Sequence, residues 1–349
     1  MSVPLFFVIT SPIFLAGGSG LWKEIPYVAG VTDNRTGSSG PRHAPEAVLF
    51  VFGMMRRTGT NFLRDLVCLH PDCGAVVPLH EDHFLKQAHN LARFVEEVHG
   101  SWRPRWGCPE GLEEQLLRRI GSCLTDFLFS MTAEDWISRP WPDLEGIERY
   151  VKATPRVLVP KTPSVQNLEW LWMFQDARAL VLVRDGRAVV ESGNRSFGWN
   201  FEEGVRQWAE AAETVLTEIP KSERLLLVRY EDLFHDLRSE MQRVLAFAGL
   251  DAESYDFDAA ESLPVRGSST FRGGAAVTHW IPLEKTEAFD PIERAQDWTV
   301  GQHERFNWIA GPQLVKLGYE RVAAKRYRRL RTIWNWFLDM RWRRARRRP

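Results

Sequence analysis

Short apolar runs recur along the chain and alternate with segments of helical periodicity. Residues 47–52 are apolar throughout and are bounded by turn-forming residues, a pattern typical of a strand buried on both faces of a parallel sheet. Similar runs are residues 157–159, 179–183 and 225–228. Because buried strands that alternate with helices form doubly wound sheets, the pattern predicts an α/β fold with a parallel sheet covered on both faces.

Each predicted strand is followed by a segment with the apolar spacing of an amphipathic helix. These helices are predicted over residues 61–69, 165–174, 187–196 and 234–248. Two further helices, over residues 81–98 and 112–131, fall in the long interval before the strand at 157. The same interval contains four tryptophans, and we interpret residues from about 84 to 150 as a helical insertion that caps the sheet.

The N-terminal part of the chain departs from this pattern. Residues 3–16 are largely apolar, but the run contains two prolines, follows no basic residue and is shorter than the roughly 18 to 20 residues of a membrane span. Gly, Ser, Pro and polar residues dominate residues 30–45. We therefore expect an N-terminal extension and linker over residues 1–45, a folded domain over 46–320 and a tail over 321–349.

The tail carries a charge that the rest of the chain balances. The whole chain has a formal net charge of zero. Residues 321–349 contain 12 Lys and Arg and one acid, Asp339, so the tail carries +11 and the rest −11. Its apolar side chains include Ile333, Trp334, Trp336, Phe337, Leu338 and Trp342.

A basic, aromatic-rich helix of this kind is typical of an anionic membrane surface. Nucleic acid and a solvated tail without a partner are the alternatives, and we expect no specific nucleic acid. Four cysteines are too few for a disulfide scaffold in a chain of 349 residues, which favours a reducing compartment. The predicted location is cytoplasmic, peripheral at the inner face of the membrane.

A loop between the first strand and the first helix has the chemistry of an anion site. The loop Gly53-Met-Met-Arg-Arg-Thr-Gly-Thr-Asn61 places backbone N–H groups at the start of a helix. Five residues separate Gly53 from Gly59 where a nucleotide P-loop has four, and Thr60-Asn61 stands in place of Lys-Ser/Thr. A P-loop kinase or NTPase, which needs that lysine and magnesium, is therefore disfavoured. A glycine turn with surface arginines is the alternative interpretation.

Two segments resemble the sulfotransferases that use 3′-phosphoadenylyl sulfate (PAPS). Arg57-Thr-Gly-Thr-Asn61 resembles the loop that cradles the 5′-phosphosulfate in this family. The segment from Leu180 to Ser192 resembles the family's strand-to-helix segment, in which an Arg and a Ser eight positions later bind the 3′-phosphate; here these are Arg184 and Ser192. Gly186 stands where the family commonly has Pro.

Weaker similarities extend over most of residues 47–320. Pro160-Lys-Thr-Pro163 and Val228-Arg-Tyr-Glu-Asp-Leu233 are similar to segments of several branches, and Val265-Arg-Gly-Ser-Ser269 is similar to a late segment of the bacterial and Golgi-type branches. The resemblance implies donor contacts from the loop residues Arg57, Thr58, Gly59, Thr60 and Asn61, and from Arg184, Ser192, Arg266, Ser268 and Ser269.

The resemblance also implies the reaction, which is transfer of a sulfuryl group from PAPS to a hydroxyl or amine. Arg57 would stabilise the bridging oxygen as the leaving phosphate gains charge. Lys161 would be a second cation near the sulfonate or the substrate, and a solvated lysine at a strand end is the alternative interpretation. Glu81 is the first candidate for the base and His80 the second; both belong to the polar segment His80-Glu-Asp-His83. A polar helix start without catalytic function is the alternative for this segment.

No metal is expected. Cys68, His70, Cys73, His80 and His83 match no standard zinc spacing, and the family's mechanism needs none. The acceptor is predicted to be a hydroxylated small molecule, carbohydrate or lipid, since some of the 15 tryptophans would line its pocket. The competing function is a non-catalytic, membrane-associated adaptor that keeps the fold.

Overall fold

The computed structural model describes only part of the chain. The described residues are 47–76, 81–102, 107, 109–130, 150, 152, 154–266, 269–272, 275–278, 291–292, 294–322 and 328–346. The chain divides into two units, Met1–Pro41 and Arg42–Pro349. The sheet, its covering helices and the candidate site all belong to the second unit.

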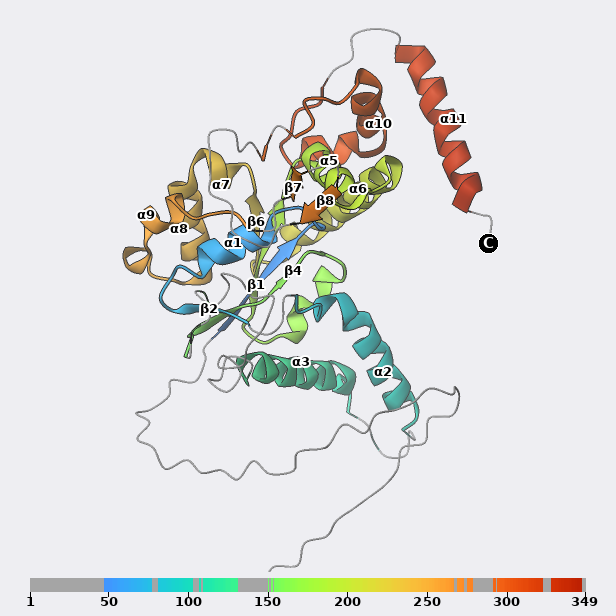
Figure 1. Cartoon of the computed structure of the whole chain (residues 1–349). Helices are drawn as coiled ribbons and strands as arrows, with labels where there is room; N and C mark the ends of the chain where they lie inside the picture. The colour runs from blue at the N-terminus through green and yellow to red at the C-terminus, as the bar shows by residue number, and fades with distance from the viewer. Residues whose placement is uncertain are drawn as a thin grey trace, which may run out of the picture. The chain divides into compact units, whose positions relative to one another are not determined.

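A parallel sheet forms the centre of this unit (Figure 1). Its strands are β1 (Ala47–Gly53), β2 (Cys73–Ala75), β3 (Val157–Val159), β4 (Lys161–Thr162), β5 (Arg178–Val183) and β6 (Leu225–Arg229). The order is β2-β3-β1-β5-β6, with β4 paired to β1, and every pairing is parallel. The predicted doubly wound α/β fold is confirmed. The carboxyl ends of β1 and β5 lie side by side, with Gly53 opposite Leu182.

Both faces of the sheet are buried, because alternate residues of each strand pack on opposite sides. Phe50 and Phe52 of β1 pack into one core and Leu49 and Val51 into the other. Helices α5 (Gly186–Phe197), α6 (Phe201–Glu218) and α10 (Val300–Lys316) cover the first face. Helices α1 (Thr60–Val67), α7 (Asp232–His235), α8 (Leu237–Ala248) and α9 (Phe257–Glu261) cover the second, and Figure 1 shows α1 and α8 across the sheet from α5 and α6.

The remaining elements lie outside these two layers. They are α2 (Ala88–Gly100), α3 (Leu112–Ser130), the C-terminal α11 (Arg328–Arg346), the antiparallel pair β7 (Ser269–Arg272) and β8 (Ala275–Thr278), and short 3-10 helices over Leu85–Gln87, Leu168–Met173, Ile219–Lys221 and Ala252–Ser254. Residues of α2 and α3 pack into the first core. None of the helices in the described ranges is long and apolar enough to cross a membrane.

Three helices differ from the prediction. The segment at 165–174 is a 3-10 helix that begins after Asn167, which has a left-handed φ of 63°. The helix expected over 234–248 is interrupted at Asp236, whose carboxylate accepts a hydrogen bond from the backbone N–H of Ser239 and so begins a new helix. The helix predicted from residue 81 begins only at Ala88, after a 3-10 turn. Helices α6 and α10 were not predicted.

Gly186 fits its place at the start of α5 for a steric reason. A Cβ atom there would lie 2.5 Å from Cδ2 of Trp208 and 2.6 Å from the ring of Phe306. Trp208 is fully buried, and its indole N–H donates to the carbonyl of Arg184 at 3.2 Å. The two aromatic rings therefore occupy the space that the family's proline ring would need.

Candidate functional site

The loop between β1 and α1 has a backbone shape that only particular residues allow. Arg57 and Gly59 both have positive φ, 73° and 107°. A Cβ atom on Gly59 would lie 2.4 Å from the ring of Tyr230, so only glycine fits there. Thr58 is buried and its hydroxyl donates to the carbonyl of Met55 at 2.5 Å. The loop therefore has a defined shape and ends at the first amides of α1, which have no acceptor within the helix itself.

Arg184 follows the last residue of β5, beside this loop. It is only 4% exposed. One Nη atom donates to the carbonyl of Arg57 at 2.8 Å, the other donates to the carbonyl of Pro291, and the guanidinium lies 4.3 Å from the centre of the Tyr230 ring. Its Nε is buried without a hydrogen-bond partner in the part of the chain that is described. A buried guanidinium with a spare N–H is suited to an anion.

Ser192 joins the two motifs. It lies in α5, is buried, and its hydroxyl accepts a hydrogen bond from Nε of Arg57 at 3.1 Å. The guanidinium of Arg57 also lies 5.6 Å from the centre of the Phe197 ring. The loop and the strand-to-helix segment, which the sequence analysis treated separately, therefore meet in one place.

Of the residues just described, Arg57, Gly59, Arg184, Phe197 and Tyr230 line a cavity of about 120 Å³, and Ser192 lies behind Arg57 as its hydrogen-bond partner. Its walls are formed by Arg56, Arg57, Gly59, Thr60, Asn61, Phe62, Glu81, Lys161, Pro163, Arg184, Phe197, Tyr230, Val265, Arg266 and Arg294. Among these described residues six carry a cationic side chain and one, Glu81, a carboxylate. Burial, together with the nearby charges of Arg294 and Arg184, lowers the pKa of Arg57 to about 10. Arg57 is still charged at neutral pH, so the cavity attracts anions strongly.

Lys161 and Glu81 lie together on the β4 side of this cavity. The Lys161 ammonium is 3.5 Å from one carboxylate oxygen of Glu81, and Nε2 of His83 is 3.0 Å from the other. Burial, and then the charge of Arg64, lowers the pKa of Lys161 to about 8, although Glu81 opposes the shift. The other candidate base, His80, lies outside the described residues.

The structure describes only part of the predicted donor segment Val265-Arg-Gly-Ser-Ser269. Arg266 lines the cavity, but its guanidinium holds the fully buried carboxylate of Asp65, with Nε donating to Oδ2 at 2.7 Å. Ser268 is outside the described residues, and Ser269 begins β7 with its side chain undescribed. The donor contacts expected from Ser268 and Ser269 therefore stay predictions.

Arg294 and Tyr230 line the cavity but were not among the predicted site residues. Arg294 lines the cavity from a segment without strand or helix periodicity, so no sequence signal pointed to it. Tyr230 belongs to the segment Val228-Arg-Tyr-Glu-Asp-Leu233, whose similarity to the family implies no ligand contact. Its ring lies beneath Arg184 and against Gly59, and burial raises its pKa. Tyr230 therefore supports both halves of the site.

A larger cavity of about 940 Å³ adjoins the first and shares Arg56 and Pro163 with it. Its lining includes Trp199 and the polar side chains of Lys86, Gln166, Glu203 and Gln207. Within the described ranges, no three His, Cys, Asp or Glu side chains come together as a metal site would require.

A cation-lined cavity at the carboxyl edge of a parallel sheet, between a strand-loop-helix turn and the neighbouring strand, is typical of proteins that bind phosphorylated ligands. The sequence model of the family described as "Sulfotransferase domain" matches residues 49–272. The chain belongs to this family and is an enzyme, a sulfotransferase, as the two motifs predicted. A search of curated proteins finds no significant match.

Solved structures with similar chains include three sulfotransferases. The sulfotransferase domain of the olefin synthase from Synechococcus PCC 7002 is 19% identical, with 85% of this chain and 95% of that chain covered and a TM-score of 0.39. Sulfotransferase STF9 from Mycobacterium avium is 16% identical, with 80% and 79% covered and a TM-score of 0.40. Mouse sulfotransferase SULT7A1, complexed with PAP, is 12% identical, with 78% and 85% covered and a TM-score of 0.37.

Proposed function

We propose that this enzyme transfers the sulfuryl group of PAPS to a hydroxyl or amine of its acceptor and releases adenosine 3′,5′-bisphosphate. The observation that carries the proposal is the hydrogen bond between Arg57 and Ser192 beside Arg184. This contact joins the loop after β1 to the strand-to-helix segment after β5, beside one cationic cavity that Arg57 and Arg184 line. Two anion-binding motifs at one cavity suit a donor that carries two separate anionic groups.

The donor contacts follow from this arrangement. The amides at the start of α1, from Thr58 to Asn61, would hold the 5′-phosphate. Arg184, with its spare Nε, and the hydroxyl of Ser192 would hold the 3′-phosphate. Arg266, with Ser268 and Ser269, would close over the nucleotide. Arg266 can do so while it pairs with Asp65, because its guanidinium has five N–H donors and the pairing uses only some of them.

The transfer step assigns roles to three further groups. The acceptor oxygen attacks sulfur while the bond from sulfur to the bridging oxygen of the phosphate breaks, and the acceptor proton passes to Glu81, or to His80 as the second candidate. Arg57 stabilises the charge that develops on the bridging oxygen, and Lys161 stabilises the sulfonate. No metal takes part in this scheme.

The larger cavity is the proposed acceptor site. It adjoins the donor cavity at Arg56 and Pro163, so an acceptor hydroxyl bound there would reach the sulfur. Side-chain amides and carboxylates beside Trp199 suit an acceptor rich in hydroxyl groups, such as a polar small molecule, a carbohydrate or a lipid head group. We also propose a cytoplasmic location at the inner face of the membrane, which the free cysteines Cys68, Cys73 and Cys123 and the basic tail support.

Isothermal titration with adenosine 3′,5′-bisphosphate tests the donor assignment. The wild-type protein is expected to bind the bisphosphate, and Arg184→Ala to weaken that binding at least tenfold, because a buried charge-assisted pair with the 3′-phosphate is lost. Arg195→Ala, on the outer part of the same helix, is the matched control and should bind normally. A thermal melt of each variant separates lost contacts from lost folding.

One result of this titration and one result of a transfer assay would contradict the proposal. Binding of ATP with magnesium but not of the bisphosphate would identify a P-loop kinase or NTPase instead. Bisphosphate binding without transfer of labelled sulfate from PAPS to any of a panel of hydroxyl and amine acceptors would favour the non-catalytic adaptor.

The lowered pKa of Lys161 predicts a pH dependence. Below a pH of about 8 the ammonium is charged and available to the sulfonate, and above it the charge is lost. The kcat/KM for PAPS is therefore expected to fall as the pH rises through about 8. Lys161→Arg keeps its charge at high pH, so its profile should lack this fall. An alkaline limb that is identical in wild type and Lys161→Arg would exclude Lys161 as its source.

A further inference from the structure

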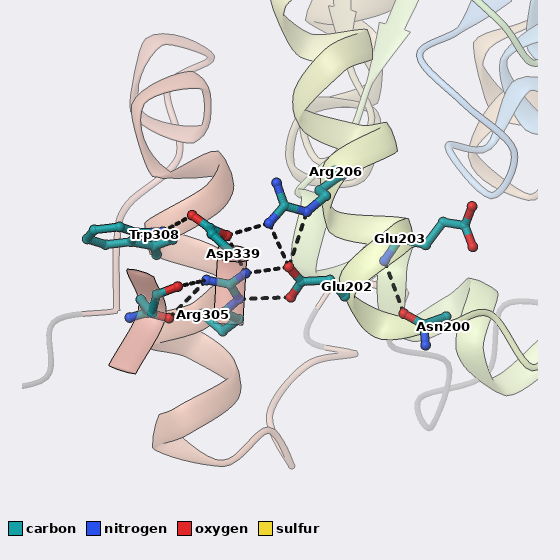
Figure 2. A network of polar contacts seen from close by, with 8 residues as sticks. Asn200, Glu202, Glu203, Arg206, Arg305, Trp308 and Asp339 are labelled. Carbon is teal, nitrogen blue, oxygen red and sulfur yellow. Dashed lines mark hydrogen bonds and ion pairs between the residues drawn. The ribbon is translucent and has the colours of Figure 1, made fainter. Parts of the chain in front are cut away.

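The C-terminal helix α11 is held against the domain by its polar side chains. Figure 2 shows Arg305 of α10 between Glu202 of α6 and Asp339 of α11. Nε of Arg305 donates to Glu202 at 2.8 Å and one Nη donates to Asp339 at 2.6 Å. The other oxygen of Asp339 accepts from the indole N–H of Trp308 at 2.8 Å. Arg206 of α6 also donates to Asp339.

The same face of α11 makes two further contacts. Asn335 is buried, and Nη1 of Arg305 donates to its backbone carbonyl at 3.1 Å and to its side chain at 3.2 Å. The guanidinium of Arg206 lies 5.2 Å from the centre of the Trp342 ring. Positions 335, 339 and 342 fall on one side of a helix with 3.6 residues per turn. We call the contacts of Arg305 and Arg206 with Asn335, Asp339 and Trp342 the polar clamp. The polar clamp determines which side of α11 points away from the domain.

The outward side of α11 is apolar and aromatic. Ile333, Trp334, Trp336 and Phe337 are 65%, 60%, 58% and 48% exposed. An ordinary surface helix turns its apolar side toward the core and its polar side toward water, whereas α11 has the reverse arrangement. A cluster of exposed large apolar side chains on one helix marks an interaction surface.

The charges around this surface indicate its partner. Arg341, Arg343 and Arg344 are exposed on the same helix. The one acidic residue of α11, Asp339, is engaged by the clamp. Aromatic side chains flanked by arginines, with no free carboxylate of the helix beside them, complement the interface of an anionic bilayer, where rings lie at the head-group level and guanidinium groups contact phosphates. A second copy would present the same positive charge and repel.

We propose that α11 docks the enzyme on an anionic lipid bilayer through its outward side. Ile333, Trp334, Trp336 and Phe337 enter the interface, the exposed arginines contact lipid phosphates, and the polar clamp at Asp339 keeps this side turned outward. The proposal deepens the membrane location suggested by the basic tail by assigning it to one face of one helix. It does not depend on the donor chemistry, so the two can fail separately.

Flotation of the full chain with vesicles tests the docking surface. The protein is expected to float with phosphatidylcholine vesicles that contain phosphatidylserine, to bind pure phosphatidylcholine vesicles more weakly, and to lose binding as salt is raised. The double variant Trp336→Glu with Phe337→Glu should bind at least tenfold more weakly. Phe94→Glu is the matched control, because Phe94 on α2 is 60% exposed and lies outside the surface.

Three additional measurements separate loss of docking from misfolding and from self-association. Bisphosphate binding and the thermal melt should be unchanged in the double variant, because its side chains point away from the core. Sedimentation without lipid reports the second possible occupant, another copy of the chain. Three outcomes would each overturn the proposal. The wild type could form a dimer that the double substitution dissociates, the double variant could bind vesicles as well as wild type, or wild type could fail to bind anionic vesicles.

Discussion

Arg57→Ala is expected to lower kcat for sulfuryl transfer by about a hundred- to a thousandfold, the effect of removing one preorganised donor to a developing oxyanion. The backbone of the loop and a hydrogen bond to Ser192 fix the position of Arg57, which the proposed mechanism assigns to the bridging oxygen. Its positive charge is most valuable when the bridging oxygen gains charge in the transition state, so kcat should fall more than the affinity for PAPS. Single-turnover formation of adenosine 3′,5′-bisphosphate from PAPS in the presence of an acceptor measures this loss.

Arg56→Ala is the comparison for Arg57, because Arg56 is its neighbour in the same loop and lines the same cavity, but is exposed to solvent and has no assigned role in the transfer step. It should change kcat less than tenfold. Arg57→Lys keeps the charge and loses the planar fork, so an intermediate rate is expected. If Arg56→Ala lost as much activity as Arg57→Ala, general attraction of the donor by the cationic cavity would replace the assigned role of Arg57.

The central strands were predictable because each is a run of apolar residues buried on both faces. The run at 157–159 is β3 itself, and the other three differ from β1, β5 and β6 by single residues at their ends. The missed helix α6 has the spacing of an amphipathic helix in Val205, Trp208, Ala212 and Val215, but it follows another helix and not a strand. Helix α10 contains Pro312, which argues against a helix in a sequence, although the structure keeps it helical.

The candidate site was predictable to the extent that it follows from topology. Loops at the carboxyl ends of adjacent parallel strands meet at one edge, so the strand order alone would bring the motifs at the ends of β1 and β5 together. Arg294 lines the same cavity, but it lies in a segment outside the sheet, where strand topology predicts nothing about its position. The pairing of Arg266 with Asp65 joins residues 201 positions apart, and no local pattern predicts which acid a given arginine meets.

The tail illustrates the same limit. Its composition predicted the class of partner, but the face that binds depends on Arg305 and Arg206, which lie outside the tail and engage Asp339. A helix considered alone offers its aromatic side chains to the core as readily as to a membrane. The clamp decides between these orientations, because the buried guanidinium of Arg305 needs the carboxylate of Asp339.

Asp65→Ala is expected to lower the free energy of unfolding by about 3–5 kcal/mol, the effect of removing one partner of a buried ion pair. Asp65 is fully buried between Arg266 and Arg64, with Nη2 of Arg64 at 3.1 Å from Oδ1. Without the carboxylate, two buried guanidinium groups have lost their shared anion. Urea denaturation followed by circular dichroism gives the change in unfolding free energy.

The double variant Asp65→Leu with Arg266→Met shows whether the loss comes from unpaired charge. Replacing both charges by apolar groups of similar volume should recover a large part of the stability lost in Asp65→Ala, because the desolvation cost of Arg266 disappears with its charge. Arg266 also lines the donor cavity, so the stable double variant is expected to bind adenosine 3′,5′-bisphosphate more weakly than wild type. Stability recovered together with unchanged bisphosphate affinity would show that Arg266 serves only Asp65 and makes no contact with the donor.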